Sequence, residues 1–305
     1  MTDLPETPRR SLPVALAVSM RPRQWLKNVL VFAAPLAAGS ILQPDVLVPT
    51  LFAFVAFCLI SSATYLVNDA RDVDVDRAHP VKRHRPIAAG QLPTSAAWVA
   101  AIVLALLSFA IAASVNTGLV GVVGLYFIFT LSYSLLLKHE PVIELALLAM
   151  GFLLRAIAGG VAADLPISQW FLIVAAFGSL FMAAGKRYSE LERSITHTDA
   201  EDRKVRKSLA GYTLGYLRFV WSVAAAVTIM GYALWAFEVA QGEASSAFAE
   251  WSVLPFVLAI LRYGVVVDKG QAEAPEDAVL GDRVLMVLGV AWVVLFGLGT
   301  FGVGS

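Results

Sequence analysis

The chain has 305 residues, of which 58% are apolar and 15% are charged, and its mean hydropathy is +0.73. These figures exclude an ordinary soluble domain, in which about a quarter of the residues are charged, and a disordered chain, while a single cysteine excludes a disulfide-stapled secreted module. The 23 basic and 23 acidic residues cancel, so the net charge by itself says nothing about partners. The composition predicts an all-α polytopic membrane protein, for which we expect no nucleic-acid partner.

The N-terminal residues resemble the start of a signal peptide, because two arginines precede a short apolar stretch over residues 12–20. Pro13 interrupts that stretch and two further arginines follow it directly, which is unlike a cleavable signal. We therefore predict a cytoplasmic or interfacial segment over residues 1–23 that contains a short helix lying in the membrane surface.

Nine apolar stretches follow along the chain. A bilayer core of about 30 Å needs roughly 20 helical residues, and most of the stretches have that length without a charge. The three weaker ones are short or carry Arg155 or Arg262, which a helix beside an internal cavity tolerates. We predict one transmembrane domain over residues 1–305 with nine helices, at residues 29–42, 46–67, 95–115, 119–137, 142–163, 167–185, 219–237, 251–267 and 284–305.

The basic residues lie on one side of this predicted topology. Four alternate loops, at residues 43–45, 116, 164–168 and 238–250, contain no lysine or arginine, whereas the remaining loops and the N-terminal segment contain many. The positive-inside rule then predicts a multi-pass protein of the cell membrane with a cytoplasmic N-terminus.

An acidic cluster follows the second predicted span. Asp69, Asp72 and Asp76 are spaced i, i+3 and i+7, and Asn68 borders them, so a continuous helix would carry all four on one stripe. Like charges stacked in this way repel one another unless a cation bridges them, and oxygen ligands with open positions suit magnesium. A solvated acidic helix end is the alternative. Basic residues that include Lys82 and Arg85 follow at once, which favours an ion-binding site, whereas Asp74 points away from the stripe.

The motif Asn68-Asp69-x-x-Asp72-x-x-x-Asp76, with the trailing sequence at residues 85–90, resembles the first signature of the UbiA superfamily of intramembrane prenyltransferases. This resemblance implies nine helices around a central cavity open to lipid. It also implies that the carboxylates hold Mg²⁺, which binds a diphosphate on the cytoplasmic side.

The second acidic signature of that superfamily is altered here. After the sixth predicted span the chain has cations and a single carboxylate, in the order Lys186, Arg187, Tyr188 and Glu190. One acidic cluster opposite two cations fits a donor with a diphosphate at one end and a separate phosphate at the other. Lys186 and Arg187 are alternatively simple cytoplasmic anchors.

Four further stretches resemble the branch of the superfamily that acts on decaprenyl phosphate: residues 21–28, 133–138, 185–191, and 275–276 with 282–283. The resemblance implies transfer of a phosphoribosyl group from phosphoribosyl diphosphate (PRPP) to a polyprenyl phosphate, with release of diphosphate, for cell-wall arabinan synthesis. The ring 5-phosphate would then lie near Lys186 and Arg187. Glu144 stands where members of the superfamily often have aspartate.

Other candidate residues lie near these motifs. Arg155 is close to the middle of a span, where a charge that faces lipid costs at least about 2.5–3.5 kcal/mol, so we expect it to face the cavity. There it would bind the polyprenyl phosphate or pair with Glu144. The full set of additional candidates for substrate contact is Arg23, Lys27, Asn28, Tyr65, Tyr133, Lys138 and Arg155. Tyr65 and Tyr133 are alternatively residues of an aromatic belt at the membrane surface.

Two other functions remain open at this stage. One is a prenyltransferase that attaches a polyprenyl chain to an aromatic acceptor, and the other is an ion-coupled transporter. The basic residues at 186–187 disfavour the first, and the position of the acidic cluster at a helix end disfavours the second. The sequence leaves open the length of the polyprenyl chain and whether the protein forms a homo-oligomer in the lipid bilayer.

Overall fold

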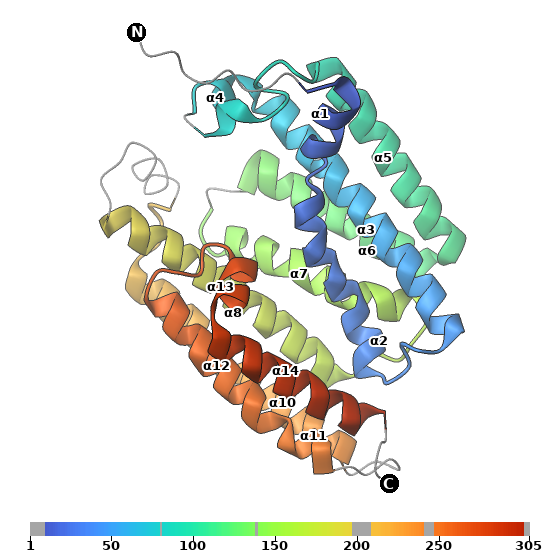
Figure 1. The fold of residues 1–305 in the computed structure, drawn as a ribbon, viewed down its shortest axis with the longest axis vertical. Helices are drawn as coiled ribbons and strands as arrows, with labels where there is room; N and C mark the ends of the chain where they lie inside the picture. Colours follow the sequence, from blue (N-terminus) through green and yellow to red (C-terminus); the bar gives the residue numbers. More distant parts are fainter. Residues whose placement is uncertain (1–9, 80, 138–139, 197–208, 241–246, 302–305) are drawn as a thin grey trace.

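The structure, a computed structural model, describes residues 10–79, 81–137, 140–196, 209–240 and 247–301. Within these ranges the regular secondary structure is entirely helical, and eight helices are long and apolar enough to cross a membrane (Figure 1). These are α3 (Pro44–Arg71), α5 (Thr94–Val115), α6 (Thr117–Ser132) with the π-helical turn η3 (Tyr133–Leu137), α7 (Ile143–Ala162), α8 (Gln169–Thr196), α10 (Leu214–Ala240), α11 (Ala247–Trp251) with α12 (Val253–Asp268), and α14 (Arg283–Thr300).

The predicted span at residues 29–42 is not among these eight. The chain there forms an 11-residue 3₁₀ helix, η1 (Pro22–Phe32), which runs into the short helix α2 (Ala33–Ala37). At about 2.0 Å per residue in η1 and 1.5 Å in α2, the two together rise about 30 Å, which is the thickness of a bilayer core. The count of nine spans and the cytoplasmic N-terminus stay predictions.

Short elements lie at the helix ends. The helix predicted near the N-terminus is present as α1 (Leu12–Ser19). The others are α4 (Val73–Arg77), the 3₁₀ turn η2 (Lys82–His84) and α13 (Pro275–Gly281). By the alternation of the long helices, α4 and α13 lie at the same end of the bundle.

The bundle has two packed halves that meet at α7 and α8. Phe57, Leu119 and Tyr126 belong to a core formed by α3, α6 and α7, whereas Phe181, Leu217 and Tyr263 belong to one formed by α8, α10 and α12. Figure 1 shows α3, α5 and α6 on one side of the molecule and α10, α12 and α14 on the other, with α7 and α8 between them. The joint itself is built from small residues such as Ala149 and Ala183, which let the two backbones approach closely.

Glycine allows η1 to lie directly on α7. A Cβ atom added to Gly159 would be 2.0 Å from the carbonyl oxygen of Val31 and 3.1 Å from Pro35 and Thr50. The contact therefore leaves no room for any other residue, and it fixes η1 beside the site described below.

Arg262, which interrupted one predicted span, is satisfied by an ion pair at the helix end. Its Nε and Nη2 atoms lie 2.9 and 2.8 Å from the Asp282 carboxylate. Asp282 also caps α14 by accepting hydrogen bonds from the backbone N–H groups of Val284 and Leu285. The hydrogen bond from Arg262 lowers the pKa of Asp282, which keeps the carboxylate ionised.

We expect Gly159→Ala to destabilise the protein by about 1–3 kcal/mol, the usual cost of overpacking, because the new methyl group must displace η1. Gly297→Ala on α14 is the matched control, since nothing lies within 4 Å of the position that its new methyl group would take. Thermal unfolding in detergent checks this prediction. Equal melting temperatures for the two variants would contradict it.

Candidate active site at the helix ends

Two buried carboxylates meet at one arginine where α3 ends. Arg85 Nη1 donates to Asp69 Oδ1 at 3.0 Å and to Asp76 Oδ2 at 2.8 Å. Arg21 Nη2 donates to the same oxygen of Asp69 at 2.6 Å. Asp69 and Asp76 are each only 3% exposed, so the arginines supply the positive charge that these carboxylates need away from water.

The predicted continuous acidic stripe is wrong in its geometry. α3 ends at Arg71, Asp72 has a non-helical ψ of 16°, and α4 begins at Val73. Across this break Arg85 lies between Asp69 and Asp76 and binds both, so the guanidinium offsets the repulsion expected between the two carboxylates. Asp72 and Asn68 are half-buried beside this pair. Asp74 lies away from it, as predicted, with its side chain 88% exposed and paired with Arg77.

Sequence reasoning missed Arg21 and named its neighbour instead. Arg23 is exposed, whereas the Arg21 guanidinium reaches Asp69 and lies 4.7 Å from the centre of the Tyr65 ring. Arg21 has a left-handed backbone with φ 56°, which turns the chain between α1 and η1. Both arginines lie in the same short basic stretch, so only the fold could separate them. Lys82 is exposed at η2.

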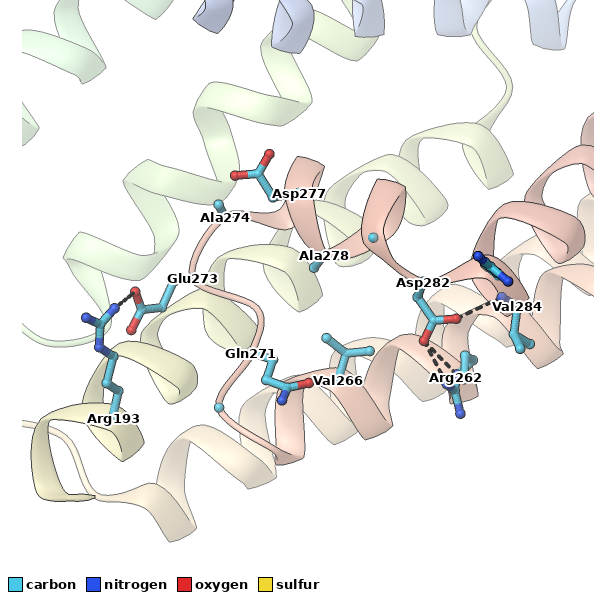
Figure 2. Close-up of a pocket in the computed structure, with 13 residues that line it drawn as sticks. Arg193, Arg262, Val266, Gln271, Glu273, Ala274, Asp277, Ala278, Asp282 and Val284 are labelled. Atoms are coloured by element: carbon cyan, nitrogen blue, oxygen red, sulfur yellow. Dashed lines mark hydrogen bonds and ion pairs between the residues drawn. The ribbon is translucent and has the colours of Figure 1, made fainter. Parts of the chain in front are cut away.

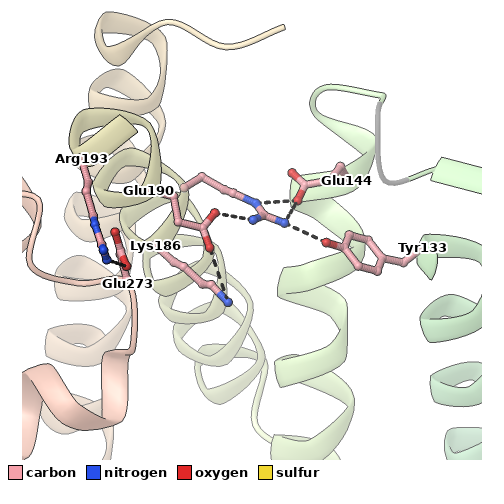
Figure 3. Close-up of polar contacts among 7 residues, drawn as sticks. Tyr133, Glu144, Lys186, Glu190, Arg193 and Glu273 are labelled. Carbon is pink, nitrogen blue, oxygen red and sulfur yellow. Dashed lines mark hydrogen bonds and ion pairs between the residues drawn. The ribbon is translucent and has the colours of Figure 1, made fainter. Parts of the chain in front are cut away.

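A second arginine joins carboxylates from two different helices at the α7–α8 joint (Figure 3). Arg187 on α8 donates through Nε to Glu144 Oε1 at 2.6 Å, through Nη2 to the same oxygen, and through Nη1 to Glu190. Its Nη2 also donates to the Tyr133 hydroxyl at 2.8 Å. Tyr133 opens the π-helical turn η3, a rare geometry that often occurs at functional sites.

The other residues of the GKRYSEL stretch divide between the two faces of α8. Lys186 lies on the face of Glu190, with its Nζ 3.8 Å from that carboxylate and its side chain 37% exposed. Tyr188 faces the opposite way: its hydroxyl accepts a hydrogen bond from Arg218 at 2.6 Å, and its ring packs against Trp221. Tyr188 thus lies on a different side of α8 from Lys186, because residues two apart in a helix point about 200° apart, and its role in substrate contact stays a prediction. Lys138 lies outside the described residues.

Arg155 forms a third polar centre inside the bundle. It donates to Asn28 Oδ1 at 2.8 Å, to the Tyr126 hydroxyl at 2.7 Å and to the Gly151 carbonyl at 2.6 Å. Pairing of Arg155 with Glu144, one of the two predicted alternatives, is wrong. The two residues are 11 positions apart on α7, about 16 Å along its axis, and Glu144 pairs with Arg187.

The side-chain nitrogen of Asn28 is also hydrogen-bonded, which fixes the orientation of its amide group. Its amide nitrogen donates to Cys58 Sγ at 3.3 Å and to Ser61 Oγ at 3.5 Å. Its oxygen therefore faces Arg155, whose guanidinium contacts these uncharged oxygens and the Tyr126 and Phe152 rings. A buried charge held by uncharged groups is expected to attract an anion. Lys27, in the same stretch, is half-buried on η1.

The first carboxylate cluster fits magnesium in its chemistry. Within the described ranges, no three histidine, cysteine, aspartate or glutamate side chains lie close enough to form a complete metal cage. Magnesium does not need one, since it is usually held by one or two carboxylates and takes its remaining ligands from water and substrate phosphates. Asp69 and Asp76 provide such a pair, with Asp72 and Asn68 alongside.

A cavity of about 710 Å³ lies at the same end of the bundle, between α8, α12, α13 and α14. Figure 2 shows ion pairs at two points of its wall, Arg193 with Glu273 at 2.8 Å and Arg262 with Asp282. Asp277 and Asp282 lie within or beside the two short stretches between residues 275 and 283 that carry part of the resemblance. Arg193 lies on α8, as do Lys186 and Glu190, and Figure 3 shows its ion pair with Glu273.

The chain matches the model of the UbiA prenyltransferase family over residues 28–288. It belongs to the UbiA prenyltransferase family. It is 50% identical to the decaprenyl-phosphate phosphoribosyltransferase of Corynebacterium glutamicum over 94% of this chain and 86% of that protein. The enzyme of the same name from Mycobacterium tuberculosis is 48% identical over 97% of each chain.

The fold agrees with this membership. A UbiA homolog from Archaeoglobus fulgidus, solved with GPP and Mg²⁺, superposes with a TM-score of 0.69 over 95% of this chain and all of that one, at 17% identity. Together with the eight apolar helices, this establishes an integral membrane protein with a UbiA-like bundle.

We expect Glu144→Gln to destabilise the protein by about 1.5–3 kcal/mol, because it removes the charge from a carboxylate that is 3% exposed and hydrogen-bonded to Arg187. Asp74→Asn is the control, since its ion pair with Arg77 is exposed and worth at most about 1 kcal/mol. Denaturation in detergent measures both changes. A Glu144→Gln protein no less stable than Asp74→Asn would contradict the structural role of the pair.

Proposed function

We propose that this protein transfers the 5-phosphoribosyl group of PRPP to a polyprenyl phosphate, decaprenyl phosphate in the first instance, and releases diphosphate. The main support is the near-full-length similarity, at 48–50% identity, to enzymes named decaprenyl-phosphate phosphoribosyltransferase. The product would serve cell-wall arabinan synthesis. Prenyl transfer to an aromatic acceptor has weaker support, because the structural likeness to UbiA homologs at 17% identity concerns the fold alone.

The first cluster would receive the diphosphate end of PRPP. Asp69, Asp72 and Asp76, with Asn68, would hold Mg²⁺, which when bound stabilises the charge that develops on the departing diphosphate. Arg21 and Arg85 already lie on these carboxylates, so they are placed to bind diphosphate oxygens once the carboxylates turn to a metal. The A. fulgidus homolog, solved with GPP and Mg²⁺, supports a metal-dependent site of this kind.

The second cluster, which consists of Arg187 with Glu144, Glu190, Tyr133 and Lys186, would receive the ring 5-phosphate. Arg187 already directs its donors to Glu144, Glu190 and Tyr133, which makes it a poor sole ligand for a phosphate. Lys186 is held more loosely, at 3.8 Å from Glu190, and is the better candidate for direct contact. Arg187 would then orient the surrounding acceptors.

The acceptor phosphate would be drawn to the buried charge of Arg155. A polyprenyl phosphate is already anionic, so its oxygen can attack C1 of the ribosyl group without a general base, and displacement from the opposite face inverts that carbon. Asn28 orients the Arg155 guanidinium through its side-chain oxygen. The polyprenyl chain would remain among apolar helices and lipid. We place the reaction on the cytoplasmic side of the cell membrane, where the positive-inside rule puts the basic loops.

We expect Asp69→Ala to lower the formation of phosphoribosyl lipid at least about 100-fold, because it removes a buried carboxylate from the proposed diphosphate site. Asp74→Ala, five residues along and exposed, should leave the rate within about twofold of wild type. The assay incubates membranes with labelled PRPP, with and without a magnesium chelator, and extracts the lipid product. Full activity in Asp69→Ala would show that the site is misassigned.

We expect Arg155→Gln to raise the KM for polyprenyl phosphate by about 10- to 100-fold while the KM for PRPP stays within about twofold, since only the acceptor would contact Arg155. Arg262→Gln is the control, because that arginine also lies in a span but pairs with Asp282. Initial-rate kinetics with each substrate varied in turn make the measurement. An equal rise in both KM values, or in the PRPP value alone, would refute the assignment.

A further inference from the structure

The segment at residues 209–213 packs against the turn that begins α7. Gly211 lies so close to Pro141 that an added Cβ atom would be 2.2 Å from the Pro141 Cγ atom. The Tyr212 side chain is buried, and its ring stacks on Tyr216 with centroids 6.0 Å apart. Glycine at 211 thus lets the backbone come near enough for Tyr212 to reach into the bundle.

The Tyr212 hydroxyl joins two groups at the start of α7. It accepts a hydrogen bond from the backbone N–H of Val142 at 2.9 Å and donates one to Glu144 Oε2 at 3.2 Å. Val142 has φ 69°, which is strained for a β-branched residue, so the hydrogen bond helps to hold an unfavourable backbone conformation. Burial raises the pKa of Tyr212 to about 12, so at neutral pH the hydroxyl keeps the proton that it donates.

Glu144 is therefore held from both sides. Arg187 binds its Oε1 atom and Tyr212 binds its Oε2 atom, so neither partner alone sets the direction of the carboxylate. If the Tyr212 hydroxyl were removed, the Glu144 carboxylate could rotate about its side-chain bonds. Arg187 would then no longer have a fixed acceptor at this position. Lys186 would be affected next, because it shares Glu190 with Arg187.

We propose that Tyr212 is a positioning residue of the donor site, which orients Glu144 and through it the Arg187–Glu190–Lys186 group that binds the phosphate of the ribosyl donor. This inference rests on the proposed function, because the property that it controls is the affinity for PRPP. Tyr212 itself would not touch the substrate, so its loss should weaken donor binding without slowing the chemical step.

The decisive variants are Tyr212→Phe and Gly211→Ala in the full-length protein. Tyr212→Phe removes only the hydroxyl, and Gly211→Ala pushes the segment away from Pro141 while keeping Tyr212. Each should raise the KM for PRPP about five- to tenfold, with kcat and the KM for polyprenyl phosphate within about twofold of wild type. Tyr216→Phe, which keeps the stacked ring and loses its own hydroxyl, is the control and should behave as wild type.

A double-mutant cycle tests whether the effect passes through Glu144. The double variant Tyr212→Phe/Glu144→Gln should have a KM for PRPP no higher than that of Glu144→Gln alone. A second readout, independent of turnover, is the PRPP concentration that gives half of the maximal rise in melting temperature. That concentration should increase in parallel with KM for each variant.

Several results would overturn the proposal. These are a fall in kcat without a change in the KM for PRPP, an equal effect of Tyr216→Phe, multiplicative effects in the cycle, or failure of both Tyr212→Phe and Gly211→Ala to fold. A wild-type protein that neither makes phosphoribosyl lipid nor is stabilised by PRPP would instead refute the proposed function. A wild type that does both, alongside a Tyr212→Phe variant that matches it, would refute only the role of Tyr212.

Discussion

A charged group that lies in an apolar interior needs polar partners, and an arginine side chain is at the middle of each of the three polar centres described above. Arg85 joins Asp69 to Asp76, Arg187 joins Glu144 to Glu190, and Arg155 binds uncharged oxygens from three segments. A planar guanidinium suits this role because its five N–H groups can bind several acceptors at once. The placement of the surrounding helix ends follows from these contacts.

The same constraint links the two halves of the bundle. Apolar packing alone gives little preference for one helix arrangement over another in lipid, because lipid chains are as apolar as leucine. The Arg187 contacts cross from α8 to α7 and to the end of α6, and those of Arg155 cross from α7 to η1 and α6. Small residues bring α7 and α8 together, and the Arg187–Glu144 pair adds a buried polar contact between them. A site between the halves is therefore also a structural element of the bundle.

Hydropathy was sufficient to predict the eight long helices, because each is a local property of about 20 residues. Spacing identified Asp69, Asp72 and Asp76, but not the break in the helix at Asp72 or the contact of Asp76 with Arg85. The partners of Glu144 and Arg155 could not be predicted, since Arg187 is 43 residues from the first and Asn28 is 127 from the second. No motif or spacing in the sequence marks Tyr126 or Tyr212. Each is a tyrosine in or beside a span, and only its contacts in the fold distinguish it.

Glu144 and Arg155 are 11 positions apart, and the helix between them makes α7 a rigid spacer between the proposed donor and acceptor regions. Eleven residues at 3.6 per turn complete three turns with about 20° left over, so both side chains leave the helix in nearly the same direction. An insertion of one residue would rotate Arg155 by about 100° and separate it from Asn28. Natural variation in this part of α7 should thus be confined to substitutions, while insertions and deletions gather in the loops outside it.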